Sequence, residues 1–449
     1  MTDQRLETEI KEVFDSNHEP SPNLENRVIA ALPWHAPVAK RTSSVPRLAG
    51  AFAVIVSAAL IVVLVGPSIL NHFSPAGGTG EPPAYSLGAV TGDYVYIVQR
   101  DPSAAALNDQ NILLQSADSG RSWVDRLHFS GIYGGMQMLG DTGYLWSLDF
   151  GDCTTQQCKQ PTQAMTLYRT TDGGVTWAAR PVTNFPVEDA FFLDATRGWA
   201  VSPNMPPING FVLFATSNGG TTWVRVGPIP SDSPIGYGYG EGDHPVTFTS
   251  DSNGNLHGWY SGATKLFTTL DGGQTWSVVP LPVPAAVSGF TATPTQPTID
   301  DRGGVLPVAY RDPKGADNVT ANVIYLYVST DGGATWGDPR PAPSGFAPVG
   351  DIISVTTLDS SRVWLTSQSD SAGDNVQAGP AVAVTMNAGK QWQVFSKTPR
   401  ILNMIFLDPL RGYAVAVTGV YDTNEIVTTQ DGGKTWQVLD VPVFPERKT

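Results

Sequence analysis

The sequence has little of what catalytic and metal-binding proteins usually display. Only two of its 449 residues are cysteine, too few for a disulfide-built scaffold. The six histidines form no H-x-x-x-H or similar cluster, and no nucleophile-elbow, phosphate-loop or dinucleotide-binding motif occurs. We therefore expect no metal and no cofactor. Charged residues make up 15% of the chain, and the formal net charge of −14 argues against a nucleic-acid partner.

Glycine and proline, in contrast, are frequent, with 46 and 36 residues respectively. Together with the low charge content, this composition is typical of a turn-rich all-β protein. The chain is long enough for one large domain with additional segments.

One short motif recurs seven times, with 44 to 60 residues between successive copies. The last copy reads Thr429-Gln430-Asp431-Gly432-Gly433-Lys434-Thr435-Trp436. Its acidic or amide position is occupied by Asp118, Asp172, Asn218, Asp271, Asp331, Asn387 and Asp431. Its final position is Trp123, Trp177, Trp223, Trp276, Trp336, Trp392 and Trp436. Such a period indicates a repeat protein with one supersecondary unit per copy.

Each copy of the motif lies between two short apolar runs, which predicts a strand, a turn and a second strand. The Asp or Asn side chain can accept hydrogen bonds from backbone N–H groups two or three residues later. The glycine suits a backbone position with positive φ, and the tryptophan offers a flat surface for a neighbouring unit. We therefore interpret these residues as structural, not as ligands or catalysts.

The motif resembles the Asp box, also called the bacterial neuraminidase repeat. Sialidases, sortilin-type receptors, xyloglucanases and photosystem II assembly factors carry it, and all of them form β-propellers. A second signature precedes the motif, as in Asp194-Ala-Thr-Arg197-Gly198-Trp199-Ala-Val201 and Asp408-Pro-Leu-Arg411-Gly412-Tyr413-Ala-Val415. This combination most resembles the photosystem II assembly-factor repeats. It implies an all-β fold, a seven-bladed propeller over residues 85–445 with strands A to D in each blade.

The segment before the repeats contains one long apolar run, Leu48–Leu70, with no Asp, Glu, Lys or Arg between Arg47 and Glu81. It reaches about 34 Å as a helix, enough to span the hydrocarbon core. The preceding basic residues predict a cytoplasmic N-terminus and an extracytoplasmic propeller in the cell membrane. We expect an uncleaved signal anchor, with a cleaved signal peptide as the alternative. Residues 71–84 are predicted to be a flexible linker.

Residues 1–46 contain two apolar patterns at helical spacing and are expected to be cytoplasmic. They resemble the cytoplasmic heads of bacterial membrane proteins, including anti-sigma factors. They contain His18 and His35 but no cysteine, so the zinc-type anti-sigma signature is absent. A sensor that relays to this segment is one alternative function.

The strand order predicts that the B–C and D–A connections lie on the face opposite the Asp boxes. These include the long segments 227–245, 311–320 and 337–350. Function usually resides in long loops on a rigid scaffold. Our candidate partner-binding residues are Tyr237, Tyr239, Glu241, Asp243, Asp312 and Asp317. The alternative is that these residues only confer solubility.

Two further patterns concern bonds and ions. Cys153 and Cys158 lie in one predicted B–C loop, and we expect a disulfide between them in an extracytoplasmic domain. Asp251, Asn253 and Asn255 alternate like calcium-loop ligands, but the acidic twelfth position is missing, so we favour a turn.

Enzymatic activity is not expected. The sialidase resemblance would require an Arg-Ile-Pro segment and a Tyr/Glu pair, and the chain has no Arg-Ile-Pro. Xyloglucanases normally place their cleft between two propellers, whereas this chain predicts one. The sequence does not exclude a carboxylate pair that meets across two blades. We therefore expect a binding or assembly-factor-like module for a protein or glycan, with a glycan-cleaving ectodomain as the alternative.

Overall fold

A computed structural model describes most of the repeat region. The described residues are 84–100, 110–149, 164–182, 185, 187, 189–204, 210–230, 246–251, 253–313, 323–344, 346, 355–366, 381–418 and 423–443. The chain divides into two compact units, Met1–Ala59 and Leu60–Thr449, and every described residue belongs to the second.

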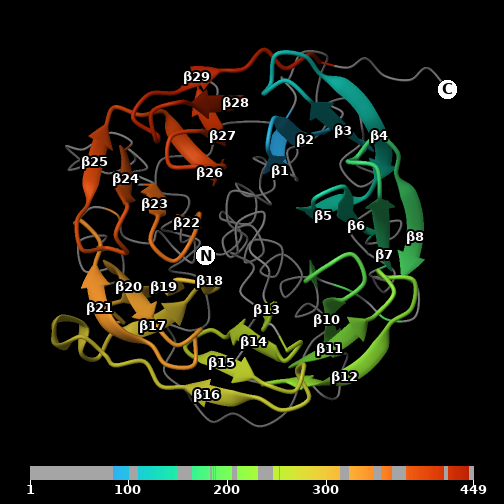
Figure 1. Cartoon of the computed structure of the whole chain (residues 1–449). Coiled ribbons are helices and arrows are strands. Elements are labelled where there is room, and N and C mark those ends of the chain that lie inside the picture. Colours follow the sequence, from blue (N-terminus) through green and yellow to red (C-terminus); the bar gives the residue numbers. More distant parts are fainter. Residues whose placement is uncertain are drawn as a thin grey trace, which may run out of the picture. The chain divides into compact units, whose positions relative to one another are not determined.

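Seven antiparallel sheets form a ring of blades, each built from one continuous stretch of the described chain (Figure 1). The strands of blades 1 to 3 are β1 (Tyr85–Thr91), β2 (Tyr94–Arg100), β3 (Gln110–Ser116) and β4 (Val124–Ser130); β5 (Ile132–Leu139), β6 (Thr142–Asp149), β7 (Ala164–Thr170) and β8 (Ala178–Val182); and β9 (Asp189–Phe192), β10 (Gly198–Asn204), β11 (Gly210–Thr216) and β12 (Val224–Ile229). Blades 4 and 5 contain β13 (Val246–Ser250), β14 (Leu256–Ser261), β15 (Leu266–Thr269) and β16 (Ser277–Val279), then β17 (Thr291–Pro294), β18 (Thr298–Asp300), β19 (Gly303–Arg311), β20 (Val323–Ser329) and β21 (Gly337–Pro341). Blades 6 and 7 contain β22 (Val355–Thr357), β23 (Val363–Thr366), β24 (Ala381–Thr385) and β25 (Gln393–Ser396), then β26 (Arg400–Phe406), β27 (Gly412–Thr418), β28 (Thr423–Thr429) and β29 (Gln437–Val438).

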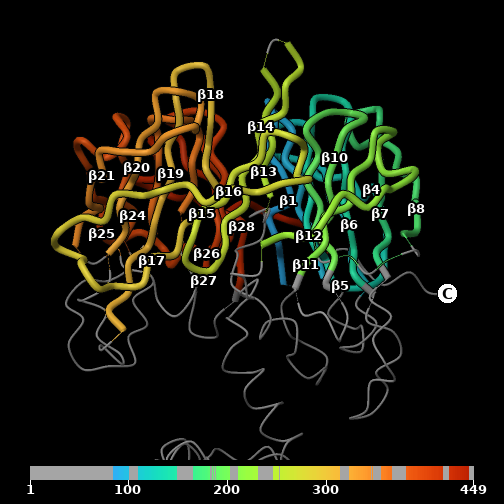
Figure 2. Tube along the Cα trace, turned by 90° about the horizontal axis from the view of Figure 1, so that it is seen from below, coloured from blue at the N-terminus to red at the C-terminus, as the bar shows by residue number. Residues whose placement is uncertain are grey.

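The strands of a blade are hydrogen-bonded in chain order, and we call them A, B, C and D. Strand A faces the centre of the ring and strand D forms the rim (Figure 1). Because the strands are antiparallel, the A–B and C–D turns leave one face, the turn face, and the B–C and D–A connections leave the other, the loop face. In the edge-on view of Figure 2, the A–B hairpin between β13 and β14 projects from the turn face. The predicted all-β seven-bladed propeller is thus confirmed.

Blade 5 departs from the regular pattern. Its strand A consists of two pieces, β17 and β18, which both pair with β19. Its strand D, β21, begins at Gly337, so the predicted D–A loop 337–350 was wrong at its start. Strand β12 likewise continues to Ile229, three residues into the predicted loop 227–245. The sequence pattern missed both extensions because exposed rim strands carry little apolar periodicity.

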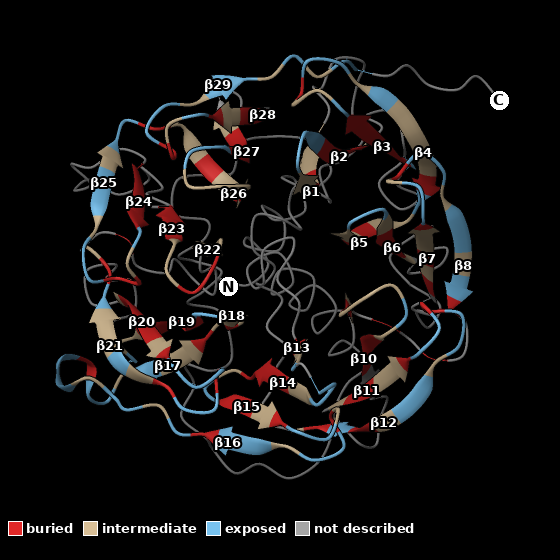
Figure 3. Ribbon diagram, in the orientation of Figure 1, coloured by how far each residue is buried: buried red, intermediate tan, exposed pale blue. Residues whose placement is uncertain are grey.

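The apolar core is divided into seven clusters, one between each pair of neighbouring blades. Strands B and C are largely buried, whereas the rim strands are exposed (Figure 3). The cluster that closes the ring joins Leu87 and Ile97 of blade 1 to Tyr413 and Ile426 of blade 7. Burial at these interfaces therefore holds the blades together.

The described residues contain one helical element, the short 3-10 helix η2 (Ala285–Val287). Among them no helix is long and apolar enough to cross a membrane. The predicted anchor Leu48–Leu70, the cytoplasmic segment 1–46 and the linker up to residue 83 lie outside the described residues.

Candidate functional site

The C–D turns share one hydrogen-bonding pattern, and Asp172 illustrates it. Its Oδ1 atom accepts hydrogen bonds from the backbone N–H of Thr176 at 2.9 Å and the hydroxyl of Thr170 at 2.7 Å. Its Oδ2 atom accepts from the Thr176 hydroxyl at 2.6 Å. The backbone bond at Asp172 comes from four residues along the chain; at Asp118 the predicted bond from three residues along, the N–H of Arg121 at 3.0 Å, forms as well. Corresponding bonds form at Asp118, Asn218, Asp271, Asp331, Asn387 and Asp431.

These bonds fix the ionisation of the turn carboxylates. The hydroxyl of Ser122 or Thr176, followed by the backbone N–H of the same residue, lowers the pKa of Asp118 or Asp172 to about 2. Thr335 has the same effect on Asp331, whose pKa is also lowered to about 2. Such carboxylates are ionised at neutral pH and unsuited to donate a proton.

The first residue of each motif is a buried Ser or Thr whose structural role was not predicted from the sequence. In the turn of blade 2, the Thr170 hydroxyl accepts a hydrogen bond from the N–H of Gly174 at 2.9 Å while donating to Asp172. The signal was present in the sequence, because all seven copies begin with Ser or Thr. The equivalent residues are Ser116, Thr216, Thr269, Ser329, Thr385 and Thr429, each at most 5% exposed.

Several turns are held by the preceding blade. The indole N–H of Trp364 on β23 donates to the carbonyl of Gly432 in the turn of blade 7 at 3.0 Å. Trp199 and Trp259 make the same kind of bond to Gly272 and Gly333 at 3.3 Å. The carbonyl groups of Gly272, Gly333 and Gly432 therefore help to join neighbouring blades.

An aromatic stack accompanies these bonds. The Trp364 ring stacks on Phe406 of the next blade, with centroids 3.9 Å apart, and Trp436 meets Phe406 edge-on. The glycine before the strand-B aromatic residue makes room for this ring, because a Cβ atom at Gly412 would lie 2.8 Å from Phe406. Gly198 and Gly258 face Phe192 and Phe248 in the same way.

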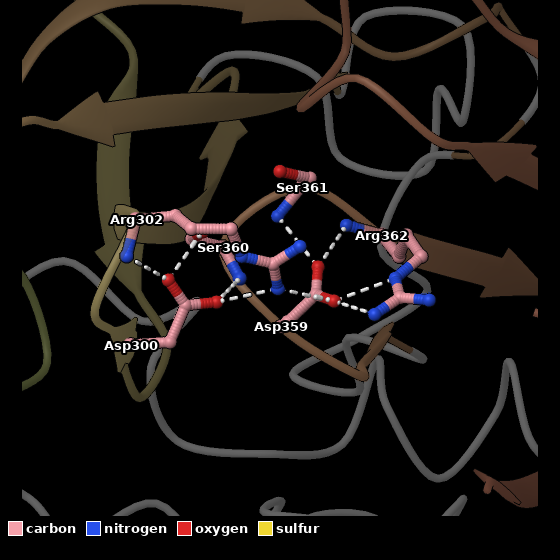
Figure 4. Close-up of polar contacts among 6 residues, drawn as sticks. All are labelled: Asp300, Arg302, Asp359, Ser360, Ser361 and Arg362. Carbon is pink, nitrogen blue, oxygen red and sulfur yellow. Dashed lines mark hydrogen bonds and ion pairs between the residues drawn. The ribbon is translucent and has the colours of Figure 1, made fainter. Parts of the chain in front are cut away.

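A polar junction on the turn face joins blades 5 and 6 (Figure 4). Arg302 lies between two carboxylates, with Nη2 at 2.9 Å from Asp300 Oδ2 and 2.6 Å from Asp359 Oδ2. The N–H of Ser360 donates to Asp300 Oδ2 at 3.0 Å, and its hydroxyl donates to Asp300 Oδ1 at 2.8 Å. Arg362 also pairs with Asp359. The junction follows from the interrupted strand A of blade 5, which places Asp300 at the blade boundary.

This junction brings two carboxylates together across blades, the arrangement that a glycosidase would need. Burial raises the pKa of Asp359, but hydrogen bonds from Arg362 and Arg302 outweigh it and hold that pKa well below the ordinary range. The pKa of Asp300 is also lowered, because hydrogen bonds from Ser360 and Arg302 outweigh the effect of its burial. A glycosidase requires one carboxyl group with a raised pKa as its general acid. The junction is therefore built as a clasp between blades and not as an acid–base pair.

The candidate binding residues fall mainly outside the described part of the chain. Tyr237, Tyr239, Glu241, Asp243 and Asp317 lie outside it, as do Cys153 and Cys158. Asp312 is described and lies half-buried just after β19, on the loop face.

The Asp251 segment forms a hydrogen-bonded turn. Asp251 Oδ1 accepts from the N–H groups of Asn253 and Asn255 at 2.8 Å, and Oδ2 accepts from the Asn255 side chain. Within the described ranges, no group of three or more His, Cys, Asp or Glu side chains is arranged to hold a metal ion.

Comparison with known proteins leaves the family of the chain unassigned. No family model matches it. A xyloglucanase from a Paenibacillus species is 32% identical over 126 residues, which cover 25% of this chain but only 12% of that protein. Similar solved structures include YCF48 bound to a D1 peptide, with 16% identity and a TM-score of 0.41, covering 69% of this chain and 82% of that one. The GH74 enzyme of Niastella koreensis has 17% identity and a TM-score of 0.48, covering 76% and 52% respectively. The similar proteins thus include a peptide-bound protein as well as glycoside hydrolases.

Proposed function

We propose that the protein is a membrane-anchored, extracytoplasmic binding module that holds a protein partner on its loop face. The observation that supports this most directly is that polar groups on the turn face are engaged in hydrogen bonds within the propeller. The motif carboxylates of its C–D turns, such as Asp431, accept hydrogen bonds within the turns, and the carbonyl of Gly432 accepts one from the preceding blade. The B–C connections, which differ in length and sequence, all leave the opposite face. We also infer that the C–D turns are Asp-box repeats.

The loop-face residues define the chemistry of the partner. Tyr237 and Tyr239 would supply the contact area, since tyrosine buries a large surface at low entropic cost. Glu241, Asp243, Asp312 and Asp317 would favour a partner with basic or cationic groups.

A binding experiment with the full chain tests this surface. Membranes of the source cells are solubilised, and the partner recovered with the tagged chain is measured as salt increases. Tyr237→Ala together with Tyr239→Ala should weaken association by about 1 kcal/mol or more, and salt should weaken it further. Tyr94→Ala is the matched control, because Tyr94 is 44% exposed and lies at an A–B turn. Binding that survives the loop-face variant but is lost in Tyr94→Ala would contradict the proposal.

Membrane attachment is a separate proposal that rests on the apolar run Leu48–Leu70 and the basic residues before it. Protease added to intact cells should remove the propeller and spare a tag at the N-terminus. The opposite pattern would exclude this topology. We likewise propose a Cys153–Cys158 disulfide, which non-reducing peptide mapping would detect. It closes a short loop, so its loss should change global stability little.

A second candidate function is binding or cleavage of a glycan, and the xyloglucanase similarity over 126 residues favours it. Xyloglucan oligosaccharides provide the test. Hydrolysis or saturable binding by the purified chain would support this function and would argue against a dedicated protein receptor. The lowered pKa values of Asp300 and Asp359 predict that Asp359→Asn would not abolish such an activity.

A further inference from the structure

The connection between blades 4 and 5, residues 280–290, differs from the other described D–A connections. Blades 1 and 2 are joined through Gly131 alone, and blades 6 and 7 through residues 397–399. The 280–290 connection projects from the rim beside β17 and β21, and most of it is exposed (Figure 3). No Asp, Glu, Lys, Arg or His lies between Asp271 and Asp300. An exposed, uncharged apolar segment on an acidic chain indicates an interaction surface.

Proline determines the backbone of this connection. Pro280, Pro282 and Pro284 alternate with Leu281 and Val283. The proline ring fixes φ near −65°, and a residue before proline is restricted to extended or polyproline II conformations. Pro284 has φ −62° and ψ 139°, which are polyproline II values. The sequence therefore pre-forms an extended helix with about three residues per turn.

The burial pattern has the same period of three. Leu281 and Pro284, three residues apart, are half-buried, and Val287 of the following 3-10 helix η2 is 2% exposed within the cluster between blades 4 and 5. The hydroxyl of Tyr327 donates to the carbonyl of Pro282 at 2.7 Å and holds the segment on blade 5. Pro280, Pro282 and Val283 are exposed, as are Ala285 and Ala286 in the following helix η2.

We propose that residues 280–284, which precede the 3-10 helix η2, are a docking site for a protein with an aromatic-lined groove that accepts a polyproline II segment. Grooves of this type bind pre-formed, proline-rich helices at low entropic cost. Because the segment carries no charge, such a partner would recognise it by shape and apolar contact. The association should therefore be insensitive to salt. As a D–A connection this segment belongs to the loop-face connections, but it contains none of the candidate residues Tyr237, Tyr239, Glu241, Asp243, Asp312 and Asp317 and does not rest on them.

Two other occupants fit the surface less well. Among the described residues Tyr94, at a turn of blade 1, is the single exposed large aromatic side chain and the motif tryptophans are half-buried or buried, so the described surface of a second copy offers little aromatic area. A lipid surface favours basic residues beside the apolar ones, and this segment has none.

Site-specific photo-cross-linking of the full chain in its source cells tests the proposal. The probe is Val283→p-benzoylphenylalanine, with Val394→p-benzoylphenylalanine as control, because both valines are exposed at 59% and 48% and Val394 lies on rim strand β25. We expect an adduct at position 283 alone, mapped to a Trp- or Tyr-lined groove of another protein. An adduct with a second copy, an adduct with lipid, or equal labelling at both positions would overturn the proposal.

Affinity measurements with the partner so identified provide the second test. Val283→Asp should weaken binding at least tenfold, and binding of the unaltered chain should change less than twofold between 0.05 and 0.5 M salt. Val394→Asp should leave binding unchanged, and both variants should keep the thermal midpoint of the parent. If Val283→Asp lowered that midpoint, or left binding intact, the segment would be structural and the proposal wrong.

Discussion

Blades 6 and 7 meet through an aromatic stack, whereas blades 7 and 1 meet mainly through aliphatic side chains. At the first interface, Trp364 stacks on Phe406 and donates to the carbonyl of Gly432. We call the second interface the seam. In blade 7, Phe406 of strand A pairs with Gly412 of strand B; at the equivalent position of blade 1, Val90 pairs with Val95, so the seam has no ring in place of Phe406. The covalent chain passes through the first interface but not through the seam.

The seam receives apolar cover from the segment that follows β29. Leu439 and Val441 pack into its cluster, and the N–H of Leu439 donates to the carbonyl of Ile426 at 2.8 Å. A Cβ atom at Gly120 would lie 2.7 Å from Leu439 Cδ1, so this segment reaches the C–D turn of blade 1. The two interfaces thus differ in the side chains that join the blades: the first uses a stacked ring pair, and the seam uses mainly aliphatic side chains around Tyr413.

The largest expected effect is at the aromatic interface. Trp364→Ala removes a fully buried ring and should lower the free energy of unfolding by about 3–5 kcal/mol. Trp364→Phe should cost about 1 kcal/mol, since it keeps a ring but loses the bond to Gly432. Denaturant unfolding measures both, with Tyr413→Phe at the seam as control. Equal losses for Trp364→Phe and Tyr413→Phe would erase the proposed difference.

The seam should respond next most strongly. Leu439→Ala should reduce stability by about 1–2 kcal/mol, because the side chain is partly buried. Truncation after Val438 should cost more, since it also removes Val441. Limited proteolysis should then cut blade 1 faster than blade 4. Uniform cleavage along the chain would show that the seam is not the weaker interface.

Acid should weaken the turns that enter both interfaces. The hydroxyl of Ser122, followed by its backbone N–H, lowers the pKa of Asp118 in the turn of blade 1 to about 2 from an ordinary 3.8. The pKa of Asp431 in the turn of blade 7 is also lowered. Because the folded-state pKa is depressed, this stabilisation is present above about pH 4 and is lost as pH falls towards 2.

The thermal midpoint of Asp118→Asn should therefore fall less steeply below pH 4 than that of the parent. The Asn218 and Asn387 turns show that an amide fits this position. A parallel slope for parent and variant would contradict this assignment.

The smallest expected effect is a gain in stability. Ala388 has φ +53° in the turn of blade 6, where the equivalent residues of five other turns are glycine. Its carbonyl accepts from Arg340 of blade 5 at 2.7 Å, so the turn belongs to the interface between blades 5 and 6. Ala388→Gly should stabilise by about 0.5 kcal/mol, the relief of left-handed strain minus the added chain entropy. Gly432→Ala is the reciprocal change and should destabilise; a loss in both variants would refute the strain argument.

The fold could be predicted from local motifs, whereas the contacts between repeats could not be predicted. The motif ending at Trp436 is complete within eight residues, so its spacing alone predicted seven blades. The bond from Trp364 to Gly432 joins residues 68 apart and required the structure. The junction at Arg302 depended on an interruption of strand A that no repeat copy indicates. For the loop face, prediction identified Tyr237 and Tyr239 by type, and their contacts remain a prediction.

Each blade uses one continuous stretch of chain, and this has a consequence for biosynthesis. During synthesis, a blade can form as soon as its own C–D turn has left the ribosome or translocon, without waiting for a strand from the other end. Blade 1, however, keeps its apolar flank at Leu87 and Ile97 uncovered until blade 7 and Leu439 have emerged. A chain stalled before Trp436 would carry six formed blades with the apolar flank of blade 1 exposed, and a chaperone would have to shield that surface.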